Sequence, residues 1–154
     1  MTYSIGVSGK PNTVVLHDFL TGTERILREE AGLPGDIPSS IAPDGSKVIF
    51  RRSCNPISFG DCPSLLLDTS SAQLQKICDF CTARGFSSDG STVLVQNYAH
   101  PGEGKDKIVA IDLHSQRQRE FLADAQRSLY HAYLSWDDHW VVFKRLLSVG
   151  KSEM

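Results

Sequence analysis

The chain has 154 residues, of which 40% are hydrophobic and 22% are charged, with a formal net charge of −2 at pH 7. These values are typical of one globular domain with enough apolar residues to form a core. Without clustered Lys and Arg we expect no nucleic-acid binding. No apolar run approaches the roughly 20 residues that span a bilayer, so we expect no membrane insertion.

Short segments rich in β-branched and aromatic residues, separated by turn residues, follow one another along the whole chain. The clearest are residues 14–16, 47–50, 64–67, 92–95, 108–111 and 140–143. No ten-residue window carries a helical apolar stripe, and residues 24–27 are predicted to be a strand that follows a turn. The sequence therefore predicts an all-β protein.

One turn motif recurs between a short strand and an apolar strand. Its copies are Asp44-Gly45, Asp89-Gly90 and Asp137-Asp138, at intervals of 45 and 48 residues. Asp-Gly is a strong signal for a two-residue hairpin turn of type I′. In the third copy Asp replaces Gly, and because Asp adopts positive φ less readily we expect a longer turn or another turn type there.

A second motif alternates with the first: an apolar strand runs into an Asp that lies three residues before a Ser or Thr. The aspartates are Asp18, Asp68 and Asp112, spaced by 50 and 44 residues. Two motifs sharing a period of about 45 residues indicate a unit of four antiparallel strands, A to D, which is a propeller blade. A β-sandwich is the alternative, but it gives no reason for two motifs to repeat in step.

We therefore predict a partial β-propeller of four-stranded antiparallel blades, about three blade equivalents in all. Residues 1–35 would end one blade with strands C and D, with residues 3–7 as a candidate strand B. Residues 36–82 and 83–128 would each form a full blade, and residues 129–154 would start another with strands A and B. Propellers close with roughly four to eight blades. The chain is thus expected to be a fragment of a longer propeller or to complete a six-bladed ring as a head-to-tail homodimer.

The pattern Ser/Ala-x-Asp-Gly-x-x-Val-x-Phe, followed by an apolar strand ending in Asp and a Ser/Thr/Gly turn, resembles the repeat of TolB-like β-propellers. The resemblance covers roughly residues 13 to 149. These propellers are similar to WD-repeat proteins in shape, although Trp136-Asp137 precedes strand B and is not the dipeptide of that family. The resemblance implies a platform for protein interaction. It also allows the propeller part of a larger enzyme, such as a serine peptidase or a receptor-type kinase.

The four cysteines are Cys54, Cys62, Cys78 and Cys81. Because the B–C and D–A connections of a blade emerge at the same end, all four sulfur atoms could be neighbours. Reduced thiols, one or two disulfides and a tetrahedral zinc site all remain open. The TolB-like resemblance implies a local loop staple for Cys78 and Cys81. The first residues of the chain lack the pattern of a signal peptide, and the compartment is left unassigned.

The recurring aspartates are interpreted as turn residues rather than as acid–base or metal groups, because Asp side chains accept backbone hydrogen bonds within turns. They are Asp18, Asp44, Asp68, Asp89, Asp112 and Asp137, with Gly45 and Gly90 in the same turns. The sequence predicts no catalytic residue, no metal site and no cofactor. Residues 85–89 lack the second Gly of a nucleophile elbow, and residues 150–152 lack the preceding Gly of a phosphate loop.

A partner is expected at the end of the propeller that carries the B–C and D–A loops, because propeller ligands meet loops at one mouth of the channel. The candidate rim consists of Arg51, Arg52, Tyr98, His100, Tyr130 and His131. Phe50, Phe143, Trp136 and Trp140 are expected to pack in the core or between blades. The leading hypothesis is a non-enzymatic segment of a TolB-like propeller that binds a protein or peptide.

Overall fold

The structure is a computed structural model that describes residues 2–5, 12–30, 37–51, 63–79, 81–97, 106–124 and 127–147. Every regular element within these ranges is a β-strand. No helix that could cross a membrane occurs in this part of the chain. The prediction of an all-β protein is confirmed.

The strands succeed one another along the chain, as the alternation of β-branched residues and turn residues predicts. They are β1 (Thr2–Ile5), β2 (Asn12–His17), β3 (Glu24–Glu30), β4 (Ile37–Ile41), β5 (Lys47–Arg51), β6 (Ser64–Asp68), β7 (Leu74–Cys78), β8 (Cys81–Phe86), β9 (Thr92–Asn97), β10 (Asp106–Asp112), β11 (Gln118–Asp124), β12 (Arg127–Leu134) and β13 (Val141–Leu147).

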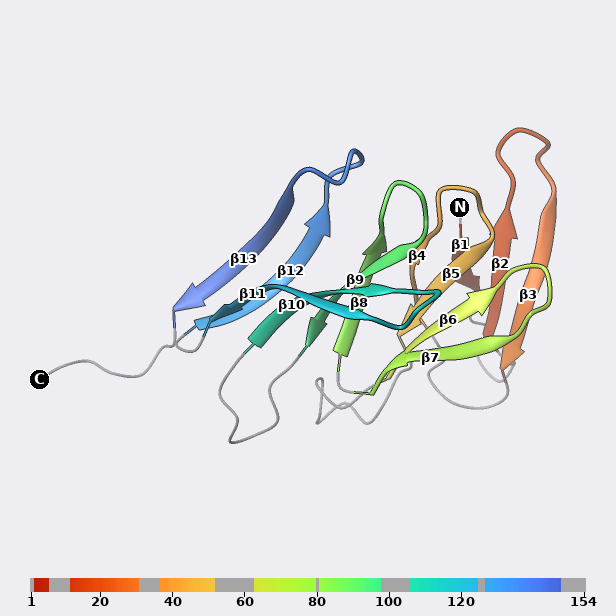
Figure 1. Ribbon diagram of the computed structural model, residues 1–154. Helices are drawn as coiled ribbons and strands as arrows, with labels where there is room; N and C mark the ends of the chain where they lie inside the picture. The colour runs from red at the N-terminus through yellow and green to blue at the C-terminus, as the bar shows by residue number, and fades with distance from the viewer. Residues whose placement is uncertain are drawn as a thin grey trace, which may run out of the picture.

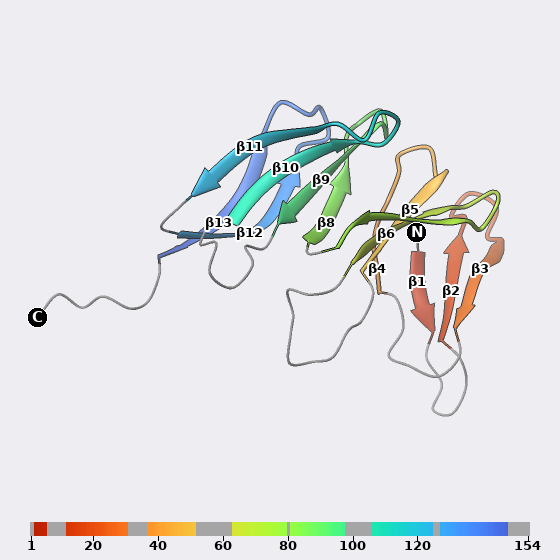
Figure 2. The same ribbon diagram turned by 60° about the horizontal axis from the view of Figure 1, so that its bottom comes forward.

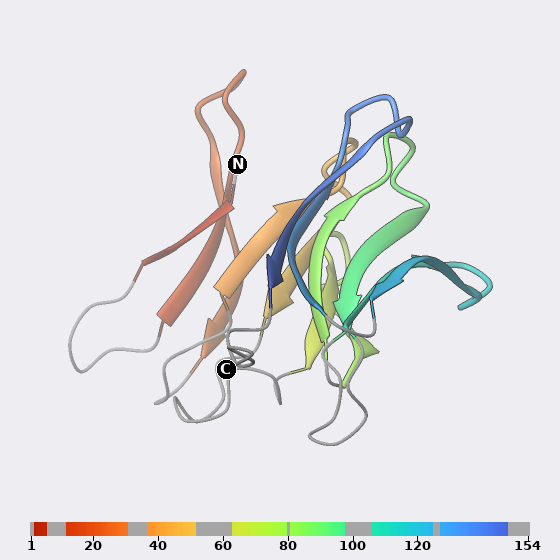
Figure 3. The same cartoon turned by 90° about the vertical axis from the view of Figure 1, so that its left-hand side faces the viewer.

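These strands form four antiparallel sheets, placed side by side in chain order (Figure 1). The first sheet contains β1–β3, the second β4–β7, the third β8–β11 and the fourth β12–β13. Figure 2 shows the same row turned toward the viewer, and Figure 3 looks at it from the β13 end. The two central sheets each have four strands in up-and-down order, so the predicted partial propeller is confirmed.

In the second and third sheets, alternate residues of strand B pack against opposite neighbours, because successive side chains point to opposite faces of a sheet. In β5, Val48 and Phe50 pack toward the first sheet, in a cluster with Val14 and Leu27. Ile49, between them, packs toward the third sheet. The core therefore consists of three apolar layers, one at each junction between sheets.

The outer strands β3, β7 and β11, which are the D strands of the first three sheets, each carry a bulge. The pairing register shifts between Val14 and Val15 in the first sheet, between Ser64 and Leu65 in the second, and between Ile108 and Val109 in the third. The extra residues occupy equivalent positions: they are Leu27, Ile77 and Phe121. Bulges bend a strand and increase its twist.

The A–B turns differ from the predicted type I′ turn. Gly45 N–H donates to the Ala42 carbonyl at 2.9 Å, and Ala42 N–H donates to the Lys47 carbonyl at 2.8 Å. Gly45 alone has positive φ (74°), and Asp44 does not. The loop therefore has four residues and a left-handed Gly at its third position. The carboxylate of Asp44 accepts the N–H of Ser46 at 2.9 Å and stabilises this geometry.

The expectation of another turn type in the third copy is also wrong. Asp138 adopts a φ of 61° at the position of Gly45. Its N–H donates to the Ser135 carbonyl at 3.0 Å. The N–H of Ser135 donates to the carbonyl of Trp140, as the equivalent groups do in the first two copies. Asp is among the non-glycine residues that tolerate this region best, since its short polar side chain forms local hydrogen bonds.

Candidate functional site

A cavity of 210 Å³ lies between the third and fourth sheets, at the end that carries the A–B turns. The loops at the opposite end were expected to bind a partner. The cavity is lined by Ser87, Asp89, Ser91, Thr92, Ala110, Arg119, Phe121, Leu134 and Asp138. Its lining includes apolar residues together with charged groups of both signs, as ligand-binding sites commonly do.

The cavity follows from one small residue. Ala110, on β10, occupies the position that Leu16 and Leu66 hold in the first two sheets. Leu66 is buried in the apolar layer of its junction. Substituting Ala for Leu removes three heavy atoms from a packed layer and leaves a void at this position. Phe121 borders the void and is 41% exposed.

Two carboxylates at the cavity are already held by hydrogen bonds. The hydroxyl of Ser87, with the N–H and hydroxyl of Ser91, lowers the pKa of Asp89 to about 2. Asp138 reaches across to the neighbouring turn and accepts the N–H of Ser88 at 2.9 Å and its hydroxyl at 2.7 Å. Both carboxylates stabilise A–B turns through hydrogen bonds, and Asp138 joins two adjacent turns.

Arg119 is the cation at the cavity. Its guanidinium lies over the ring of Phe121, 4.4 Å from the ring centroid. A cation over an aromatic face contributes about 0.5–1 kcal/mol at an exposed site. Arg119 and Phe121 are both exposed on β11.

Gln96 was missed by the sequence analysis. It is fully buried on β9. Its amide nitrogen donates to the carbonyl of Leu129, and its amide oxygen accepts the N–H of His131 at 3.0 Å. A single polar residue inside an apolar strand pattern is the only sequence signal for this contact between sheets.

The six recurring aspartates each accept a backbone N–H from a residue two positions ahead, as the turn interpretation expects. The acceptors are Asp18, Asp44, Asp68, Asp89, Asp112 and Asp137. These bonds favour the ionised carboxylate and lower the pKa of all six. For Asp68 the hydroxyl of Ser70 is the largest cause. Groups held ionised in this way are poorly suited to proton transfer at neutral pH.

The structure describes only part of the predicted rim. Arg51 ends β5 in the second sheet and is half-buried, whereas His131 is exposed on β12 in the fourth sheet. Tyr130 lies on β12, but its side chain is outside the described residues. Arg52, Tyr98 and His100 are also outside them, so the rim stays a prediction.

Cys78 and Cys81 form a disulfide between the end of β7 and the start of β8, with their Cα atoms 5.9 Å apart. Both side chains pack against the apolar layer between the second and third sheets. Cys54 and Cys62 lie outside the described residues. The disulfide removes two thiols from the four-cysteine zinc site considered above. No group of three potential metal ligands occurs in the described part of the chain.

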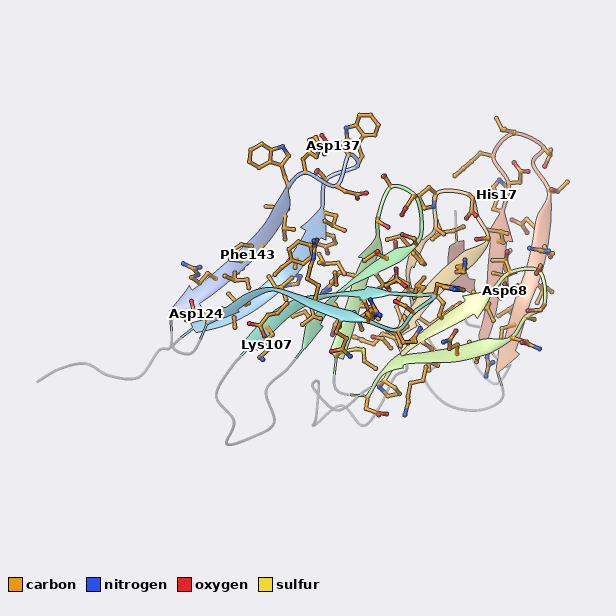
Figure 4. All side chains as sticks on the ribbon, in the orientation of Figure 1. His17, Asp68, Lys107, Asp124, Asp137 and Phe143 are labelled. Carbon is orange, nitrogen blue, oxygen red and sulfur yellow. A yellow bond between two sulfur atoms is a disulfide. The ribbon has the colours of Figure 1, made fainter. Side chains whose placement is uncertain are left out.

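The prediction that Trp136 and Trp140 are buried is wrong, whereas Phe50 is fully buried as predicted. Trp136 is 88% exposed and Trp140 is 74% exposed, on the β12–β13 turn. Trp136 occupies the turn position that Pro43 and Ser88 hold in the other copies, which explains why no core is available to it. Figure 4 labels Asp137 on this turn, far from Asp68 at the end of β6.

No family model and no curated protein matches the sequence. The structure is similar to TolB from Acinetobacter baumannii (TM-score 0.68, 20% identity), covering 97% of this chain and 35% of that protein. It is similar to a putative TolB from Agrobacterium tumefaciens (TM-score 0.68, 15% identity), covering 97% of this chain and 51% of that protein. A prolyl endopeptidase structure also matches (TM-score 0.71, 15% identity), over 95% of this chain and 24% of that protein.

The chain thus spans between about a quarter and about a half of these proteins. At such identities the likeness concerns the fold and not the activity. The agreement with two TolB structures over nearly the whole chain supports the resemblance seen in the repeat motifs. The chain has a TolB-like β-propeller fold.

Proposed function

We propose that the chain is a non-enzymatic propeller segment that serves as a scaffold for protein interaction. The observation that carries this proposal is the exposure of Trp136 and Trp140 on one turn. Tryptophan is enriched at binding hot spots, because its large ring buries much area at a small entropic cost. Leu134 and Asp138, from the same hairpin, border the cavity.

A second exposed apolar turn supports the proposal. Phe19 and Leu20, on the β2–β3 turn, are 72% and 97% exposed. The polar residues Ser70 and His114 hold the position of Leu20 in the other two C–D turns. An apolar side chain at the tip of a turn gains nothing from folding, and such residues commonly mark contact surfaces when they gather.

Site-specific photo-crosslinking in the producing cell tests this proposal. A benzophenone amino acid replaces Trp136 in one variant and Lys76, on β7 of the second sheet, in the matched control. Lys76 is also exposed, but it lies beside Asp79, to which it is ion-paired at 2.8 Å. We expect a discrete protein adduct from position 136 and none from position 76. Equal adduct patterns from both positions, or none from either, would contradict a scaffold role for this surface.

The alternative function is the propeller part of a larger enzyme, such as a serine peptidase or a receptor-type kinase. The similarity to a prolyl endopeptidase structure extends to the fold alone. The flanking coding sequence separates the two proposals: further Asp-Gly repeats alone favour the scaffold. A Gly-x-Ser-x-Gly motif downstream or a kinase-like region upstream favours the enzyme.

A further inference from the structure

Arg84, on β8, has a buried guanidinium nitrogen without a hydrogen-bond partner. Among the described residues, its Nε is the one buried side-chain nitrogen or oxygen of which this is true. The rest of the guanidinium also forms no hydrogen bond or ion pair with a described residue. Burying a donor without an acceptor costs free energy, and in a native protein such a group commonly has a functional reason.

The backbone places Arg84 at a bulge on a sheet edge. Ala83 pairs with Val95, and Gly85 pairs with Leu94. Arg84 lies between these two pairs and has no cross-strand neighbour. The third sheet has the order β11-β10-β9-β8, so β8 is one of its edge strands. Bulges are common at sheet edges and beside active sites, where they redirect a side chain.

The neighbouring A strands carry bulges of their own. In β4 the pairing register skips Ser39, and in β12 it skips His131 and Ala132. β8 contacts both β4 and β12 across the junctions between the sheets (Figure 2). Both strands that flank β8 therefore belong to the described part of the chain. Ser39 and His131 are exposed. We call the side of the row that β4, β8 and β12 form the A-strand edge.

Ser39 shows how the protein satisfies a bulged residue at the A-strand edge. Its hydroxyl lies 3.3 Å from the carbonyl oxygen of Ile49 and 3.5 Å from that of Ala83 in the next sheet, and it can donate to either. Arg84 holds the equivalent position in the third sheet, three residues before the A–B turn. Its guanidinium has five N–H donors in a planar fork. The described part of the chain supplies no acceptor for them.

The charge and the shape of this group define the chemistry of a ligand. Arg84 is the only charged residue of β4 and β8. A guanidinium binds a carboxylate through two parallel N–H···O bonds. A phosphate group carries about −1.5 to −2 charges at pH 7 and is commonly held by several Arg side chains. A singly charged carboxylate therefore suits Arg84 better than a phosphate does.

The residues next to Arg84 on β4 and β8 are small. Gly85 has no side chain, and a Cβ atom placed on it would meet only one neighbouring atom, the Oγ of Ser40, at 3.9 Å. This distance is an ordinary van der Waals contact. The position beside Arg84 could therefore hold further atoms without displacing its neighbours.

We propose that Arg84 binds the carboxylate group of a ligand at the A-strand edge, between Ser39 of β4 and His131 of β12. The carboxylate belongs to a free small acid or to an acidic side chain of a protein. The ligand completes the hydrogen bonds that the guanidinium lacks within the described part of the chain. This site does not depend on the scaffold function proposed above, which rests on the β12–β13 turn.

The NMR resonance of the Arg84 Nε–H group tests the proposal directly. We expect succinate to shift this resonance saturably in a titration at constant ionic strength, and sodium chloride to leave it in place. Arg25 is the matched control, because it is an exposed Arg on β3 of the first sheet. Its Nε–H resonance should move little and without saturation. Equal shifts at both residues, or no shift at Arg84, would overturn the proposal.

Arg84→Met separates ligand binding from a structural role, because it keeps an unbranched side chain and removes the guanidinium. It should raise the thermal unfolding midpoint of the ligand-free chain by about 2–4 °C, since the buried donor without a partner is gone. It should also abolish the stabilisation by succinate, whereas Arg25→Met should preserve it. A lower midpoint in Arg84→Met would mean that the chain itself satisfies the guanidinium. That result, or persistent stabilisation by succinate, would overturn the proposal.

Arg84→Lys keeps the positive charge but lacks the planar fork, and it should weaken succinate binding by about tenfold. Equal affinity in this variant would overturn the bidentate assignment. Succinate and the peptide acetyl-Gly-Glu-Gly-amide distinguish the two sources of the carboxylate: tighter binding of the peptide identifies a protein side chain, and tighter binding of succinate identifies a free acid. Inorganic phosphate that binds more tightly than both would overturn the ligand class.

Discussion

Two junctions, one between the second and third sheets and one between the third and fourth, use different side chains to satisfy equivalent buried backbone groups. In both, the A strand of the later sheet has a carbonyl and an N–H, two residues apart, that face the earlier sheet. At the first of these junctions, Ser64 donates to the Cys81 carbonyl at 3.1 Å and accepts the Ala83 N–H at 2.9 Å. At the second, the amide of Gln96 does both for Leu129 and His131.

The two polar side chains come from opposite members of one cross-strand pair. Ser64 pairs with Arg51 in the second sheet, and Gln96 pairs with Ile108 in the third. The polar residue thus lies on strand C in one sheet and on strand B in the next. What the repeat preserves is the satisfaction of two buried backbone groups, since leaving such groups unpaired costs about 1–3 kcal/mol each.

The same two junctions differ in how completely they are filled. Leu66 fills the earlier one, whereas Ala110 leaves a cavity in the later one. Ile49 and Leu94 are both fully buried at equivalent positions, whereas Val142, the next equivalent, is 67% exposed. Val142 is exposed because no described sheet packs on that face of the fourth sheet.

The largest expected effect concerns the residues that differ most in burial. Leu94→Ala should lower the free energy of unfolding by about 2–5 kcal/mol, because it empties a packed layer. Val142→Ala, at the equivalent position of β13, should change it by less than about 0.5 kcal/mol. Urea unfolding at pH 7 measures both. Similar losses in the two variants would mean that Val142 is covered in solution.

The next effect concerns the polar contacts between sheets. Gln96→Leu removes both hydrogen bonds and should cost about 2–4 kcal/mol, because the carbonyl of Leu129 and the N–H of His131 become buried without a partner. Ser64→Ala should cost a similar amount at the other junction. Chemical unfolding compares the two, and hydrogen exchange of the His131 and Ala83 amides serves as a local readout. A neutral Gln96→Leu would show that water replaces the amide.

A smaller effect is expected from the turn carboxylates, which lie at the surface. Their folded pKa values are below the usual value near 3.8, so the stability that they contribute is present above pH 4 and is lost as the pH falls through the folded pKa. For Asp89 the window extends from about pH 4 to about pH 2. Asp89→Asn should therefore differ most from the parent chain at neutral pH, and the difference should shrink toward pH 2. A difference that is independent of pH would exclude this cause.

The smallest effect concerns the C–D turns. Gly22, Ala72 and Gln116 hold the same position with positive φ, and for Ala72 the angle is 56°. Ala72→Gly should stabilise the chain by roughly 0.5 kcal/mol, because relief of left-handed strain outweighs the added freedom of the unfolded chain. Ala123→Gly, in β11, is the control and should destabilise by roughly 0.5–1 kcal/mol. Thermal unfolding of both variants is the measurement, and a destabilised Ala72→Gly would contradict the assignment of strain.

Much of the candidate site could not be predicted from the sequence. The cavity depends on Ala110 lying opposite Leu134 of another sheet, and the sequence shows only that a small residue replaces Leu66 in the repeat. Asp138 was read as a turn residue with an unfavourable φ, but its carboxylate holds the neighbouring turn through Ser88. Local patterns carry no information on which turns become neighbours in space.

By itself, the sequence determined the strand pattern, the period of about 45 residues and the fold, because strand alternation and turn chemistry are local properties. Tertiary structure alone decided which face of each sheet is covered, and it left Trp136 and Trp140 at the surface against expectation. It also decided that Gln96 and Ser64 form hydrogen bonds with equivalent backbone groups of the next sheet. The physical reason is that burial depends on the presence of a neighbouring sheet, and the residues of one strand do not encode that presence.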